Sequence, residues 1–285
     1  MYKNLREKLN EIIDYWENKE DGSRDEDVMS FEDDIKEWLD EVPEFKLYRY
    51  TSAQYYSLRN FEKQTIHLSP NGVMNDIYEG LPANDIRNCS PSVISSLGDM
   101  ASMTCFTQSK DNTLMWSHYG DSSRGICVEY DLMLLDANSE IFSHLFPVIY
   151  TSKRFVRHNV STLQSSMKDL RRAIEDGYEY DGDLDLNDIL PLFVYKGKDW
   201  EYENEWRIIY TKKQIYDEDR TDLYSGNLQF PCVTGIYLGY RIDSEIKNNV
   251  LEIAERMSAE SGRKIRVYQA RLSNESYDIT FDECN

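Results

Sequence analysis

The sequence predicts an α+β fold with a mixed, mostly antiparallel sheet and a helical segment at its N-terminus. Short runs rich in aromatic and β-branched residues recur along most of the 285-residue chain. Helical patterns do not separate these runs regularly, and no glycine-rich phosphate loop follows any of them. Both observations argue against a doubly wound nucleotide-binding fold and favour an α+β arrangement.

Residues 1–44 are predicted to form a helical appendage. Apolar residues recur there at helical spacing: Leu5, Leu9, Ile12, Ile13 and Trp16. A second short helical pattern lies around Phe31–Leu39, and Pro43 ends it. We expect the body of the protein to span residues 45–285.

The body begins with a predicted strand, FKLYRYT, over residues 45–51, and a helix capped by Ser52 follows it. A second strand is expected at residues 66–69. Further runs predict strands: MTCFTQ, GICVEYD, FPVIYT, EWRIIYT, VTGIYLG and KIRVYQARL. Helical periodicity predicts helices within residues 90–101 and over residues 160–177 and 242–261.

Composition narrows the classes of function. The formal net charge of −20 argues against unaided, non-specific binding of nucleic acid, although it leaves room for a local basic groove. The chain has no apolar run long enough for a membrane span and no secretory leader, so we expect a cytoplasmic protein with no membrane partner. The five cysteines lack CxxC spacing, so neither a zinc site nor a disulfide framework is indicated.

The segment KDWEYENEWRIIY carries the main site hypothesis. It places Glu201, Glu203 and Glu205 at every second position before an apolar, aromatic run. Alternate residues of a strand share a face, so Glu203 and Glu205 are expected to project together from a strand that is otherwise buried. Buried carboxylates are costly unless they are paired or used. The pattern therefore predicts a functional site, or else ordinary strand residues with Glu205 paired to Arg207.

Two other segments hold candidate residues. In LYRYTS, Arg49 lies between two tyrosines of a predicted strand, where it is either exposed or available to a phosphate or ribose. In MWSHYG, the aromatic residues Trp116 and Tyr119 form either core or a platform that stacks a planar ring. His118 between them is read more simply as a structural histidine than as a base.

Four blocks together resemble the bacterial domain-of-unknown-function family 2971. They are LYRYTS, IHLSPNGVMNDIYEG, CFTQSKDNTLMWSHYGDSSRGICVEYD and KGKDWEYENEWRIIY. The turn MNDIYE departs from the proline-phenylalanine form of the family, and residues 1–44 lie outside the resemblance.

The order of elements is also similar, more distantly, to ADP-ribosyltransferase-fold toxins. That resemblance implies NAD as co-substrate, no metal, and a catalytic set of Arg49, Glu203 and Glu205. Glu205 would stabilise the positive charge that develops on the ribose, and Glu203 would orient or deprotonate the acceptor. The residues expected to contact NAD are Tyr50, Thr51, Thr107, Trp116, His118 and Tyr119.

Three functions therefore remain open. The first is an NAD-dependent ADP-ribosyltransferase, acting as an intracellular toxin or phage-defence effector on a protein or nucleic-acid acceptor and held by a possible antitoxin or inhibitory partner. The second is a metal-dependent nuclease using Asp76, Glu79, Glu203 and Glu205, although EWR lacks the lysine expected after the last carboxylate. The third is a non-catalytic binding module with an aromatic partner surface.

Overall fold

The structure is a computed structural model. It describes residues 2–18, 35–70, 74–80, 101–154, 169, 172, 186–211 and 228–284.

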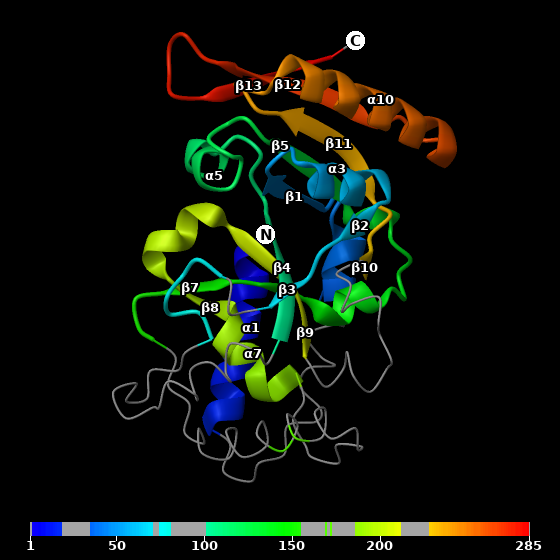
Figure 1. Ribbon diagram of the computed structural model, residues 1–285. Coiled ribbons are helices and arrows are strands. Elements are labelled where there is room, and N and C mark those ends of the chain that lie inside the picture. Colours follow the sequence, from blue (N-terminus) through cyan, green and yellow to red (C-terminus); the bar gives the residue numbers. More distant parts are fainter. Residues whose placement is uncertain are drawn as a thin grey trace.

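A nine-stranded mixed sheet forms the centre of the fold (Figure 1). Its strands run in the order β13 (Ile279–Glu283), β12 (Arg266–Leu272), β11 (Val233–Leu238), β5 (Ile126–Asp131), β1 (Lys46–Thr51), β4 (Ala101–Thr107), β9 (Glu205–Thr211) and β6 (Leu145–Pro147), and β3 (Ser69–Pro70) pairs with β4. Every pair is antiparallel except β11 with β12. The predicted α+β class with a mostly antiparallel mixed sheet is confirmed.

Two small sheets and several helices complete the described part. The strand β10 (Leu228–Gln229) pairs with β2 (Thr65–Ile66), and β7 (Ile149–Thr151) pairs in parallel with β8 (Tyr195–Gly197). The α-helices are α1 (Tyr2–Asn18), a helix over 35–41, α3 (Tyr55–Glu62), α5 (Thr113–His118), α7 (Leu186–Val194) and α10 (Ser244–Ser261). The 3-10 helices are η3 (Leu132–Leu134), η4 (Glu140–His144) and η5 (Lys198–Glu203).

Most of the predicted strands appear, with differences at their ends. The run FPVIYT forms two strands: β6 pairs with β9 in the large sheet, and β7 pairs with β8 in a small one. Val148 between them donates its amide to the carbonyl of Glu205. The helix after β1 begins at Tyr55, and its N-cap residue is Gln54 rather than Ser52. Of the helix expected within residues 90–101, residues 90–100 lie outside the described part of the chain; of the helix expected over 160–177, only residues 169 and 172 are described, and both are helical.

The two halves of the large sheet separate between β1 and β4. These strands share one register pair, Tyr48 with Thr107, whereas β1 pairs with β5 along its whole length and β4 pairs with β9 along its whole length. Figure 1 shows the result: β1, β5 and β11 lie with α3 and α10, and β4 and β9 lie closer to α1 and α7. The gap between β1 and β4 positions the candidate site.

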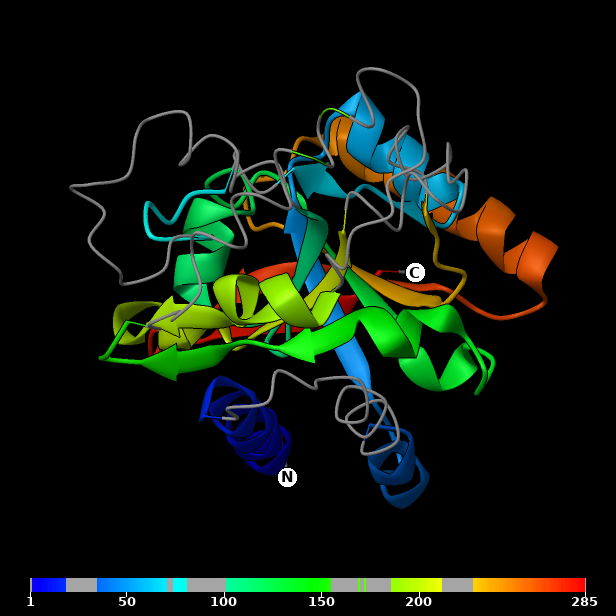
Figure 2. The ribbon, with the colours of Figure 1, turned by 90° about the horizontal axis from the view of Figure 1, so that it is seen from below.

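The N-terminal helices pack onto the body. Leu5, Leu9 and Ile13 of α1 are buried in the same core cluster as the strand residues around them. The ring of Trp38 stacks on Trp206 of β9, with ring centroids 6.5 Å apart. Figure 2 shows α1 and the helix over 35–41 on their own side of the strands, well apart from α3 and α10.

None of the helices in the described ranges has both the length and the apolar composition needed to cross a membrane.

Candidate active site

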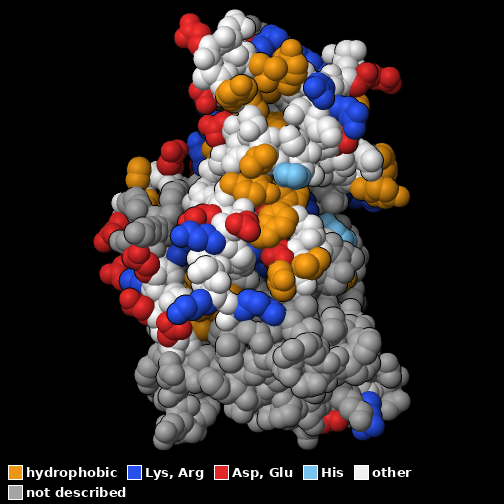
Figure 3. All heavy atoms as spheres, turned by 90° about the vertical axis from the view of Figure 1, so that its left-hand side faces the viewer, with side chains coloured by type: hydrophobic (Ala, Val, Ile, Leu, Met, Phe, Trp, Pro, Cys, Tyr) orange, Lys and Arg blue, Asp and Glu red, His pale blue; other side chains and the backbone are white. Residues whose placement is uncertain are grey.

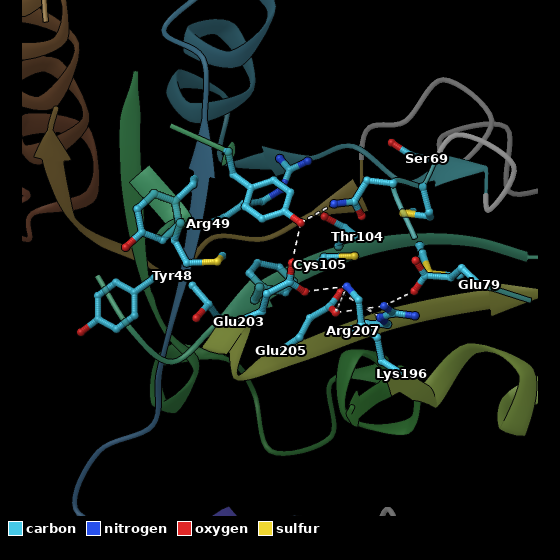
Figure 4. A pocket seen from close by; sticks show the side chains of 18 residues that line it. Tyr48, Arg49, Ser69, Glu79, Thr104, Cys105, Lys196, Glu203, Glu205 and Arg207 are labelled. Carbon is cyan, nitrogen blue, oxygen red and sulfur yellow. Dashed lines mark hydrogen bonds and ion pairs between the residues drawn. The ribbon is translucent and has the colours of Figure 1, made fainter. Parts of the chain in front are cut away.

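A cavity of about 260 Å³ opens at the gap between β1 and β4. Tyr48, Arg49 and Tyr50 line it from β1, and residues Met103–Thr107 line it from β4. The remaining wall comes from β3, α5 and its C-cap, β8, β9, the end of η5 and the loop after β3, through Ser69, Met74, Asn75, Glu79, Met115, Tyr119, Lys196, Glu203, Glu205 and Arg207. Figure 4 shows these side chains converging on one pocket from segments that are distant in the sequence.

The two carboxylates reach this pocket by a different backbone path from the predicted one. Glu203 is the last residue of η5, and Glu205 is the first residue of β9. Asn204 between them adopts the left-handed conformation, with φ 46° and ψ 51°, which short polar side chains tolerate best after glycine. The expectation that both glutamates lie on one strand is therefore wrong, but both side chains still face the same pocket.

Two buried cations hold the carboxylates. The Lys196 ammonium donates to Glu203 Oε2 at 2.5 Å and to Glu205 Oε2 at 3.1 Å. The Arg207 guanidinium donates to both oxygens of Glu205 at 2.9 Å and also forms an ion pair with Glu79. Glu203 and Glu205 are only 2% and 4% exposed, so each charge depends on these partners.

Tyr119 completes the polar wall. Its hydroxyl donates to Glu203 Oε1 at 2.5 Å and accepts from the Asn75 amide at 2.6 Å. Glu203 thus accepts one hydrogen bond from a described residue at each oxygen, and a carboxylate oxygen can accept two. Acceptor capacity for a bound hydroxyl or amine remains on this residue.

The pKa values of the two carboxylates are shifted in opposite directions. Burial opposes ionisation of Glu205, but Arg207 and Lys196 outweigh it and lower the pKa of Glu205 to about 2. Burial and the neighbouring charge of Glu205 raise the pKa of Glu203 above its ordinary value. Glu205 is consequently a fixed negative charge, and Glu203 is the member of the pair that can exchange a proton.

Arg49 lines the cavity but leaves the sheet on the face opposite to Glu205. Tyr48 is paired with Thr107, and Thr107 with Glu205, so these three side chains share one face of the sheet and Arg49 leaves from the other. Arg49 still lines the cavity because the strands separate at this point. It therefore lies in one pocket with Glu203 and Glu205 but not on the same face.

The predicted cofactor-binding residues divide into two groups. Tyr50, Thr107 and Tyr119 line the cavity. Trp116, His118 and Thr51 lie outside it. Trp116 faces inward from α5 and packs edge-on against Tyr50, with ring centroids 5.0 Å apart. His118 is exposed at the end of α5, and the hydroxyl of Thr51 bonds with Ser57.

Sequence reasoning missed several residues of the pocket. Lys196 lies in the three-residue strand β8, which is too short to give a periodic signal. Asn75 lies in the segment MND, which the sequence alone leaves open as a turn or as polar groups at a pocket rim. Thr104 lines the cavity, and its hydroxyl is buried with no hydrogen-bond partner in the described part of the chain. A buried hydroxyl in that state is suited to a polar ligand group.

The carboxylates of the nuclease hypothesis are used for internal contacts. Glu79 pairs with Arg207, and Asp76 accepts a hydrogen bond from the amide of Tyr78. Across the described ranges, no group of three or more His, Cys, Asp or Glu residues is arranged to hold a metal ion.

A protein-family model matches part of the chain. No curated protein and no solved structure matched the chain when each was searched. Residues 115–208 match the family described as protein of unknown function (DUF2971), which confirms the resemblance to that family across the segment that supplies Tyr119, Lys196, Glu203 and Glu205.

Proposed function

We propose that the pocket binds the nicotinamide and ribose of NAD and that the protein transfers the ADP-ribosyl group to an acceptor. The observation that carries this proposal is the pair of carboxylates with opposite pKa shifts in one cavity: Glu205 lowered to about 2 and Glu203 raised. A fixed charge beside a proton-exchanging carboxyl is a suitable arrangement for group transfer.

The roles follow from the chemistry. Breaking the bond between nicotinamide and ribose develops positive charge on the ribose, and the fixed charge of Glu205 stabilises that transition state. Glu203 accepts the proton of the acceptor nucleophile as the new bond to ribose forms. The unpartnered hydroxyl of Thr104 and the guanidinium of Arg49 are available to the ribose and diphosphate.

The resemblance to ADP-ribosyltransferase-fold toxins supports the choice of NAD, and we extend the proposal to a role as an intracellular toxin or phage-defence effector. The cavity is small for a whole dinucleotide, so the adenosine half of NAD would lie outside it.

The test is nicotinamide release from NAD by the purified protein, with and without cell lysate. We expect release by the wild type and a fall of about a hundredfold or more in Glu205→Gln and Glu203→Gln. Because buried substitutions can unfold the chain, circular dichroism and NAD binding are measured on each variant, and Thr104→Val serves as a milder pocket change. A folded wild type that neither binds nor consumes NAD would overturn the proposal.

A non-catalytic binding module is the second candidate. The observation in its favour is that Glu205 is already bound by Arg207 and Lys196, as a purely structural residue would be. If the protein is such a module, the wild type shows no NAD turnover, and Glu203→Gln and Glu205→Gln change only the free energy of unfolding.

A further inference from the structure

A second hollow of about 700 Å³ lies between α3 and the strands β1 and β5. Four of the residues that line it have basic side chains: Arg49, Arg59, Lys63 and His67. Among the described residues that line it, none is acidic. This is unusual on a chain whose formal net charge is −20. We call these four residues and the hollow that they line the basic groove.

The cations of the basic groove are available to a ligand. Arg59 and Lys63 are exposed and four residues apart at the end of α3, so they lie on one face about one turn from each other. Neither forms an ion pair with another residue of the described ranges. Glu62, the acidic residue of the same helix, is instead paired with Arg256 of α10 at 2.6 Å.

Tyrosines lie at the edge of the basic groove. Tyr56 lines it and is 75% exposed, and the neighbouring Tyr55 is 71% exposed. Their rings contact each other edge to face, with centroids 5.8 Å apart. Exposed aromatic rings beside a row of cations are the combination that binds single-stranded nucleic acid, because the cations follow the phosphates and the rings stack on bases.

The basic groove also meets the candidate active site. Arg49 lines both hollows, because it leaves β1 at the gap between β1 and β4. A second basic hollow, near β7 and β8, is less suitable, since Asp76 and Asp199 line it together with Lys153, Arg154 and Lys198. Figure 3 views the molecule from the side of β7 and β8 and shows acidic side chains beside the basic ones there.

We propose that the basic groove binds the backbone of a single-stranded nucleic acid and presents that strand as the acceptor. The binding stands on the groove itself, whereas the acceptor role rests on the proposed function. The overall negative charge repels polyanions at long range, so the strand binds through the local cations and with strong dependence on salt.

The experiment is fluorescence anisotropy with labelled 20-nucleotide single strands of DNA and RNA, in the absence of NAD and over a range of salt concentrations. The three permanent cations of the groove are Arg49, Arg59 and Lys63. If all three contact phosphates, the logarithm of the association constant should fall linearly with the logarithm of the salt concentration, with a slope of about −2. The double variant R59E/K63E should bind at least tenfold more weakly. Tyr56→Ala should weaken binding about tenfold and leave the salt slope unchanged.

A matched control is available at the edge of the sheet formed by β12 and β13. Lys264 and Arg271 are exposed and paired with Glu283 and Asp282, and K264E/R271E makes the same change in net charge. If K264E/R271E weakens binding as much as R59E/K63E does, overall charge decides the affinity and the groove assignment is overturned. R59Q/K63Q replaces the first variant if charge reversal disturbs folding.

Other outcomes separate the possible ligands. No binding of either strand at low salt overturns the proposal, as does equal binding of a poly-glutamate peptide. NAD could instead displace the bound strand at the concentration at which NAD itself binds, and R59E/K63E could weaken NAD binding. Those two results together would assign the groove to the adenosine diphosphate half of NAD. Failure of the proposed function is distinct: the strands bind, but no nicotinamide is released and no strand is labelled.

Discussion

At the scale of single residues, Lys196 is the group on which the buried carboxylates depend. It bridges Glu203 and Glu205, and its side chain is 3% exposed. Lys196→Met would leave two neighbouring carboxylates with less opposing charge. Removing one partner of a buried ion pair typically costs about 3–5 kcal/mol, so we expect a loss of that order in urea unfolding. Lys264→Met, at an exposed pair, should be nearly neutral in the same measurement.

The pH dependence of stability reports on Glu205. Its folded pKa of about 2 lies below the ordinary 4.5, so the stabilising contribution is complete above pH 4.5 and is lost as pH falls toward 2. The pKa difference corresponds to roughly 3 kcal/mol. We therefore expect Glu205→Gln to be less stable than wild type at pH 7, and the gap to narrow by about half or more at pH 3. A gap that is constant with pH would show that Glu205 is not ionised in the folded protein.

Tyr119 controls the proton affinity of Glu203. Its hydroxyl bonds to the ionised carboxylate and thereby limits the rise in the pKa of Glu203 caused by burial and by Glu205. Tyr119→Phe should raise that pKa further, so the acidic limb of the rate profile for nicotinamide release moves to higher pH. Loss of one such hydrogen bond lowers the rate by about tenfold. A lower rate with an unmoved profile would assign Tyr119 to substrate contact instead.

At the scale of elements, the junction between η5 and β9 sets the position of both carboxylates. Asn204 holds a left-handed conformation there, and its amide and carbonyl bond to Glu201 and Gln108. Asn204→Gly should keep the activity. Asn204→Val should cost about 1–2 kcal/mol and reduce NAD turnover, because a β-branched residue resists this conformation. Equal behaviour of the two variants in unfolding and turnover would show that the backbone angle is not what positions Glu203.

The elements that sequence could predict are those with strong local patterns. The strands β1, β4, β5, β9 and β11 are aromatic or β-branched runs, and the sequence predicts each within a few residues of its observed bounds. The fold class followed from their order. The left-handed Asn204 was not expected, because alternation of Glu203 and Glu205 reads as a strand in the absence of backbone angles.

The candidate site was predictable only in part, for a topological reason. The sequence indicates Glu203 and Glu205 because they precede an apolar, aromatic run, and it indicates Tyr119 because it belongs to the aromatic segment MWSHYG. Lys196 and Thr104 are ordinary residues in their segments, and only the pairing of β4 with β9 and the return of β8 bring them to the pocket. No spacing rule in the sequence indicates that β1 and β4 separate after one register pair.

At the scale of the whole molecule, the N-terminal residues belong energetically to the core. Among the residues of this segment whose burial is described, seven apolar side chains are buried: Leu5, Leu9, Ile13, Ile35, Trp38, Leu39 and Val42. Burying each contributes about 1.5–3 kcal/mol, and the sum is comparable to the 5–15 kcal/mol of net stability that domains usually have. The boundary expected at residue 44 therefore need not be a boundary in folding, and we expect residues 45–285 alone to lack a cooperative unfolding transition.

A point change tests the same coupling in the full chain. Leu9 is fully buried on α1, and Leu9→Ala should cost about 2–5 kcal/mol in urea unfolding, whereas the exposed Glu11→Ala on the same helix should be nearly neutral.

Helix α1 also contacts the site: Arg6 donates to the carbonyls of Val148 and Glu205 at 2.8 and 3.3 Å. When both effects of Arg6→Met are expressed as free energies, its loss in NAD turnover should consequently exceed its loss in unfolding stability. If residues 45–285 unfold cooperatively and release nicotinamide at the wild-type rate, α1 is an appendage and its contacts with β9 do not position Glu205.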